Sequence, residues 1–118
     1  MTELIACLST GKGTWAQVYK LVDNEQFEKI VLITNDFGKE NFKKNDKTEL
    51  VAVDMNKDVK LLRDDILAKL KELIKGSEVA VNFISGAGKE HMAMMGALVK
   101  MGIGFRLINL GKEGVEEI

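Results

Sequence analysis

Short apolar runs alternate with longer amphipathic segments along this chain. Five runs rich in aliphatic residues predict buried strands, at residues 4–8, 29–34, 50–54, 79–84 and 105–110. Between them, apolar residues recur at helical spacing within three segments, which predicts helices at residues 15–22, 59–73 and 90–101. Because the strands are near-continuous apolar runs, we expect helices to cover both faces of the sheet that they form.

Glycines and polar residues predict where these elements end. We expect the second helix to stop at Gly76 and the third at Gly102, since helices often end at glycine. Residues 36–44 are polar apart from two phenylalanines, which indicates a short helix or an ordered loop.

The alternation of strands with helices predicts the topology. Connections of this length are right-handed crossovers and give a parallel sheet. We expect a single α/β domain over residues 1–118, with a Rossmann-like, doubly wound, mainly parallel five-stranded sheet of order 3-2-1-4-5. Strands 1 and 4 are neighbours in this order, and ligands bind beyond their carboxyl ends, where the chain reverses direction.

Composition narrows the partner classes. The 118 residues carry a formal net charge of -1, which argues against a broad basic surface for duplex nucleic acid. The lone Cys7 lies in an apolar run and predicts a reducing compartment. There is no signal-like N-terminus and no run of the roughly 20 apolar residues that a membrane span needs. We therefore expect a cytoplasmic protein that makes no membrane contact, and a small anionic ligand fits this composition.

Two glycine-rich loops follow the two neighbouring strands. The first comprises Ser9, Thr10, Gly11, Lys12 and Gly13, and the second comprises Ser85, Gly86, Ala87, Gly88 and Lys89. Glycine lets backbone approach a ligand closely, and free N–H groups at a helix start attract anions. Either loop alone is compatible with a plain strand-to-helix turn. Their convergence predicts a binding site for a phosphate-rich nucleotide, with Asn35 to Phe37 at its rim.

Two known nucleotide-binding motifs contain glycine-rich loops of this general kind. A Walker A loop fails, because Phe83 stands where its first glycine is needed and Glu90 follows Lys89. A dinucleotide fingerprint, G-x-G-x-x-G/A, matches residues 11–16, and Asp36 lies near the distance of a ribose-binding acid. The alternative function is therefore a small Rossmann module that binds NAD or another dinucleotide.

A longer stretch carries a family resemblance. Residues 81–92 (VNFISGAGKEHM), followed by Ala93, Ala97 and Gly102, resemble the signature of CARF domains, the Rossmann-like sensors of cyclic oligoadenylates in type III CRISPR antiviral defence. The family motif places Thr-Gly-Gly-Thr-Lys between a strand and a helix rich in small residues and Met. Ser85, Gly86 and Lys89 match it in kind. Ala87 and Gly88 replace Gly and Thr, and the second replacement removes a hydroxyl.

The resemblance implies a ligand and an assembly. CARF domains act as homodimers, with a cyclic tetra- or hexa-adenylate lying across the two-fold axis. The chain would then be a stand-alone sensor, the sensor half of a separate effector protein, or a metal-independent ring nuclease without a cofactor. In cleavage a ribose 2′-hydroxyl attacks the adjacent phosphate and displaces the 5′-oxygen of the next nucleotide, leaving a 2′,3′-cyclic phosphate and a 5′-hydroxyl. Lys89 would stabilise the charge, and Ser9 or Thr10 would position the ribose or phosphate. The Met-rich helix at residues 90–101 is apolar on most sides, which predicts either a dimer contact or burial against the sheet.

Other residues have weaker claims to function. His91 could act as an acid or base, although a histidine there is more often a surface residue. Trp15 and Tyr19 fit a core or an interface better than a base-stacking platform. Asn82, inside an apolar strand, predicts a structural role in fixing a loop, and residues 64–65 read as solvated charge on a helix.

Overall fold

The computed structural model describes residues 2–118 and contains one six-stranded sheet of order β3-β2-β1-β4-β5-β6. All neighbours are parallel except β5 and β6. The strands are β1 (Thr2–Cys7), β2 (Phe27–Thr34), β3 (Thr48–Ala52), β4 (Glu78–Asn82), β5 (Gly104–Gly111) and β6 (Gly114–Glu117). The predicted doubly wound α/β fold and its 3-2-1-4-5 order are therefore confirmed, with one strand added.

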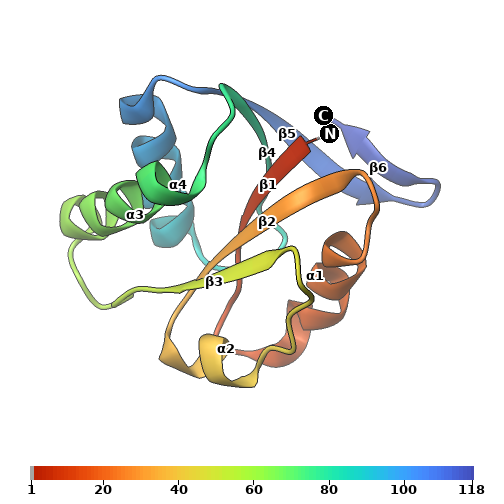
Figure 1. The fold of residues 1–118 in the computed structure, drawn as a ribbon. Coiled ribbons are helices and arrows are strands. Elements are labelled where there is room, and N and C mark those ends of the chain that lie inside the picture. Colours follow the sequence, from red (N-terminus) through yellow and green to blue (C-terminus); the bar gives the residue numbers. More distant parts are fainter. Residues whose placement is uncertain (1) are drawn as a thin grey trace.

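Helices cover both faces of the sheet (Figure 1). They are α1 (Trp15–Val22), preceded by a 3-10 turn (Lys12–Thr14), α2 (Asp36–Asn41), α3 (Val59–Leu73) and α4 (Gly88–Met101). α3 and α4 pack side by side on one face, and α1 lies on the other. Among residues 2–118, no helix is both long enough and apolar enough to cross a bilayer.

The two-residue period of β1 divides the interior into two cores. Leu4 and Ala6 join the core beneath α1, whereas Ile5 and Cys7 join the core beneath α3 and α4. All four side chains are at most 1% exposed. This is why the central strands read as continuous apolar runs rather than alternating ones.

The sixth strand is a correction to the expected five. Gly114, with a φ of 118°, turns the chain after β5, and β6 pairs antiparallel with β5, so that Val115 lies opposite Leu110. β6 has four residues with one aliphatic side chain. The sequence did not predict this strand, because a segment of four residues with one aliphatic side chain contains no apolar run.

The expected end of the second helix at Gly76 was wrong, whereas α4 does end at Gly102, with a φ of 72°. α3 ends at Leu73, and Ile74 is already extended, with its side chain in the core. The Gly76 N–H instead donates to the buried Glu3 carboxylate, 2.9 Å away. Burial of Ile74 therefore ended the helix before the glycine.

Candidate functional site

The two glycine-rich loops meet at the carboxyl ends of β1 and β4. The Ser9 backbone N–H donates to the Ser85 hydroxyl oxygen at 2.8 Å, and the Thr14 hydroxyl donates to the same oxygen at 2.6 Å. Ser85 is only 1% exposed. The two loops thus meet where the strand order of the sheet reverses, between β1 and β4. The Ser85 hydroxyl joins them through its two hydrogen bonds.

Ser9 is also engaged in holding the first loop. Its hydroxyl donates to the Gly11 carbonyl at 2.6 Å, and its own carbonyl accepts from the Trp15 indole at 3.0 Å. The side chain of Ser9 therefore shapes the turn that enters α1. Thr10, by contrast, is exposed, and its hydroxyl oxygen accepts a hydrogen bond from the Asn35 amide at 2.6 Å. Since that oxygen accepts from Asn35, the Thr10 proton is available for donation.

Close packing shapes the second loop. Gly86 has a φ of 98°, and a Cβ there would lie 2.8 Å from Cys7 Cβ and 3.1 Å from His91 Nε2. His91 Nε2 lies 2.8 Å from the Ser85 carbonyl, so this nitrogen donates to it. The His91 ring also packs on Phe83, with 4.6 Å between ring centroids. His91 therefore positions the loop, and only glycine fits at residue 86.

A carboxylate caps the helix that follows. Glu90 accepts a hydrogen bond from the Ala87 backbone N–H, one of the free donors at the start of α4. Gly88 and Lys89 lie exposed beside this contact. Negative charge is therefore already present at this helix terminus, and an anion bound here would lie next to it.

Three loop glycines face open space. Gly11, Gly13 and Gly88 have no positive φ. Beyond their chain neighbours and the nearby backbone of their own helix, no atom of residues 2–118 would lie within 4 Å of a Cβ at any of them. Neither backbone conformation nor packing within the described chain requires glycine at these positions, and the backbone there is open to a ligand.

A cavity of about 250 Å³ lies where the loops meet. Thr10, Gly86, Ala87 and Glu90 line it, together with Asn35 at the end of β2. The side-chain oxygen Oδ1 of Asn35 also caps α2 by accepting from the Gly38 N–H at 3.0 Å, which fixes the side chain that borders the cavity. The predicted rim residue Asn35 therefore reaches the same cavity as the loops.

A larger groove of about 490 Å³ adjoins this cavity over the ends of β2 and β3. Thr10, Asn35 and Met55 line both spaces. The groove is further lined by Asp36, Phe37, Val53, Asp54 and Asn56. Residues 53–56 were not singled out from the sequence, because the loop after β3 has no glycine motif. The strand order did contain the signal, since it places the end of β3 on this edge of the sheet.

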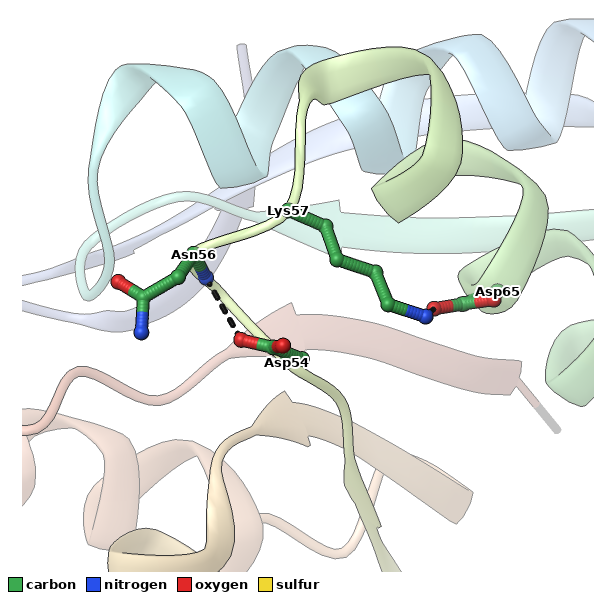
Figure 2. A network of polar contacts seen from close by, with 4 residues as sticks. All are labelled: Asp54, Asn56, Lys57 and Asp65. Atoms are coloured by element: carbon green, nitrogen blue, oxygen red, sulfur yellow. Dashed lines mark hydrogen bonds and ion pairs between the residues drawn. The ribbon is translucent and has the colours of Figure 1, made fainter.

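Two polar contacts hold the loop after β3, one within the loop and one to α3 (Figure 2). Asp54 accepts a hydrogen bond from the Asn56 backbone N–H at 3.0 Å, and Lys57 Nζ lies 2.7 Å from Asp65 Oδ2 on α3. The hydrogen bond to Asp65 and the charge of Asp65 raise the pKa of Lys57 above its usual range, which favours the charged ammonium. Asp65 is thus part of a surface ion pair.

The two loop lysines lie at the surface. Lys12 Nζ stands 5.5 Å from the centroid of the Trp15 ring and 5.9 Å from that of Phe37. Lys89 is exposed in the first turn of α4. Long, flexible ammonium side chains at these positions can reach an anion over either loop.

Cys7 lies beneath the second loop and is not a nucleophile at neutral pH. Burial, aided by the charge of Glu90, raises the pKa of its thiol to about 12.

Residues 2–118 also contain no group of three or more His, Cys, Asp or Glu side chains placed to hold a metal ion.

Three further residues, Asn82, Trp15 and Tyr19, have structural roles. Asn82 donates to the Ile108 carbonyl and accepts from the Ile84 N–H, both at 2.9 Å, so its predicted structural role is confirmed. Trp15 is 6% exposed, and Tyr19 stacks on Phe42 with 4.3 Å between ring centroids. These two aromatic residues belong to the packing around α1.

The dinucleotide fingerprint fits the structure poorly. Its third small residue should pack the helix closely against the strand, but Ala16 is exposed. A 3-10 turn also separates Gly11 from α1. Comparison with known proteins adds no relative: no protein-family model matches the chain, and a search of curated proteins finds no match.

Proposed function

We propose that this protein binds a phosphate-containing adenine nucleotide at the junction of its two glycine-rich loops, with a cyclic oligoadenylate as the ligand. The observation that carries this proposal is the set of open glycines at 11, 13 and 88, in the two loops whose other residues line a cavity at the switch point. Glycines that the chain itself does not need are expected where a ligand approaches the backbone.

The loops offer suitable donors for phosphate oxygens. The Thr10 hydroxyl lines the cavity. The loops add exposed backbone at Gly11 to Gly13 and the ammonium groups of Lys12 and Lys89. Glu90 already occupies the Ala87 N–H. Phosphate should therefore lie toward the first loop and Lys89 rather than directly over the start of α4.

Of the two activities implied by the CARF resemblance, the contacts favour a sensor. Ser9 and His91 are committed to loop contacts through their hydroxyl and Nε2 atoms. Lys89 remains to stabilise charge on a phosphate, and Glu90, the carboxylate that lines the loop cavity, is engaged by the Ala87 N–H. Cleavage would then depend on the geometry imposed on the ribose 2′-hydroxyl alone.

A second copy of the chain fits the exposed side of α4. Met92 and Val99, seven residues apart on this helix, are 65% and 67% exposed. Met92 is one turn from Lys89, so a two-fold contact along this side would bring both copies' second loops near each other. A cyclic ligand with two-fold symmetry could then contact both sets of donors.

The test is the melting temperature with cyclic tri-, tetra- and hexa-adenylate, linear oligoadenylate, ATP and NAD. A ligand at 100 times its dissociation constant adds about 2.7 kcal/mol, which raises the melting temperature by roughly 10 °C. We expect one cyclic species to do this, and the Lys89→Ala variant to lose much of the shift.

Lys100→Ala is the matched control, because Lys100 is exposed at the other end of the same helix. It should keep the full shift. A shift with NAD and none with any ring, or equal shifts in both variants, would reject the proposal. Incubation of the stabilising ring followed by product analysis then separates a sensor from a nuclease.

A further inference from the structure

The groove over the ends of β2 and β3 has no role in the phosphate contacts above. Its volume, about 490 Å³, lies within the range of sites that hold small molecules, roughly 300–1,000 Å³. It is continuous with the loop cavity through Thr10, Asn35 and Met55. We propose that this groove binds the aminopurine base of the nucleotide whose phosphates lie over the loops, an inference that rests on the proposed function.

The groove presents an apolar surface for a flat ring. Phe37 is 41% exposed, which is high for a large aromatic side chain, and it lines the groove. Its ring is supported by Trp15, whose ring centroid lies 6.1 Å away. Met55 adds a second apolar surface from the loop after β3, and its unbranched side chain can adapt to a ring. A base can therefore stack here on groups that are already in place.

Acceptors at the groove select a base that carries an amino group. Asp54 uses part of its carboxylate to accept from the Asn56 N–H and keeps further lone pairs at the exposed surface. The Lys57–Asp65 pair holds this loop against α3 (Figure 2). A carboxylate held in this way accepts from the exocyclic amino group of adenine, whereas it repels the carbonyl oxygen that replaces it in hypoxanthine.

Charge sets the direction of the bound nucleotide. Asp36 and Asp54 line the groove, whereas Lys89 belongs to the second loop and Lys12 lies between the first loop and the Phe37 edge of the groove, with Nζ 5.9 Å from the ring centroid. Phosphate is repelled by the two carboxylates and attracted by the two lysines on the loop side. The base therefore points toward β3 and the phosphates toward α1 and α4.

The experiment is an amide NMR titration of the full chain with adenosine, inosine and ribose 5-phosphate. We expect adenosine to shift the amide signals of residues 36–37 and 53–56, and inosine to bind about tenfold more weakly. Ribose 5-phosphate should shift residues 9–13 and 85–89 instead.

The outcomes separate the two proposals. If ribose 5-phosphate shifts the loops but adenosine leaves residues 53–56 unchanged, or inosine binds equally well, the base subsite is rejected and the phosphate site stands. If adenosine shifts the groove and ribose 5-phosphate shifts nothing, the base subsite is supported and the phosphate-binding proposal fails. If no probe causes a shift, both are rejected.

Two variants test the assigned contacts. Phe37→Ala should weaken the binding of adenosine roughly 5- to 100-fold, since stacking on an aromatic ring contributes about that much affinity per base. Its control is Leu61→Ala, because Leu61 is 55% exposed on α3, away from the groove. Asp54→Asn keeps a side-chain acceptor for the Asn56 N–H and should reduce the preference for adenosine over inosine. An unchanged preference would remove Asp54 from the base contact.

Discussion

The two loops at the switch point have similar sequences and opposite construction. The second, residues 85–88, is enclosed at its start, where Ser85 is buried and Gly86 packs on Cys7, and it is open only at Ala87 and Gly88. The first, residues 9–13, is tied at Ser9 by hydrogen bonds, while Gly11 and Gly13 face open space. The start of the second loop is therefore a closely packed support, whereas the first loop and Gly88 offer backbone that a ligand can contact. Packing requires glycine at residue 86, and it does not require glycine at residues 11, 13 and 88.

The largest expected effect comes from Gly86→Ala in the enclosed loop. A Cβ at a φ of 98° is strained and would meet Cys7 Cβ at 2.8 Å. We expect a loss of about 2–4 kcal/mol in the free energy of unfolding, measured with urea. Gly102→Ala is the control, because its φ is 72° and nothing in residues 2–118 beyond its neighbours approaches its Cβ position. A cost no greater than that of Gly102→Ala would show that the second loop is not closely packed.

The next effect tests whether the enclosed loop seals Cys7 from water. The pKa of the thiol is raised from 9.0 to about 12 in the folded state. Between these pH values the unfolded thiol loses its proton and the folded one keeps it, so stability falls as pH rises. The slope from this one group is at most about 1.4 kcal/mol per pH unit.

The measurement is urea unfolding from pH 8 upward for the wild-type chain and for Cys7→Ala. Lysines and Tyr19 are present in both chains, so the difference in slope isolates the thiol. We expect the wild-type chain to lose stability more steeply above about pH 9. Parallel curves would mean that water reaches Cys7 through the second loop.

The smallest effect, and one of opposite sign, is expected in the open loop. Gly11 is extended, with a φ of -75° and a ψ of 141°, and its Cβ position is free. Gly11→Ala should therefore raise stability by about 0.4–1 kcal/mol, by reducing the freedom of the unfolded chain. The same change should weaken nucleotide binding if the ligand approaches this backbone. A loss of stability would show that the first loop is packed after all.

The sequence predicted best the strand order and the positions of the loops, because both depend on patterns that are visible within short segments of the chain. Five aliphatic runs separated by helical patterns were enough for the strand order, and glycines after the first and fourth runs located the loops. Whether a hydroxyl is free or engaged leaves no such trace. Ser9 and Thr10 look alike as candidate donors, yet the first binds the Gly11 carbonyl and the second lies exposed at the cavity. Met55 and Asp54 likewise become site candidates only when β3 is placed beside β2.

The short β6 hairpin has a consequence for self-association. Without it, β5 would present an eight-residue open edge on which another chain could extend the sheet. β6 occupies that edge with four residues, of which Glu116 and Glu117 are exposed. If two molecules paired through their β6 strands, the carboxylates of Glu116 and Glu117 would approach those of the second molecule, and only four residues of each strand could pair. This side of the sheet is thereby protected against growth into aggregates.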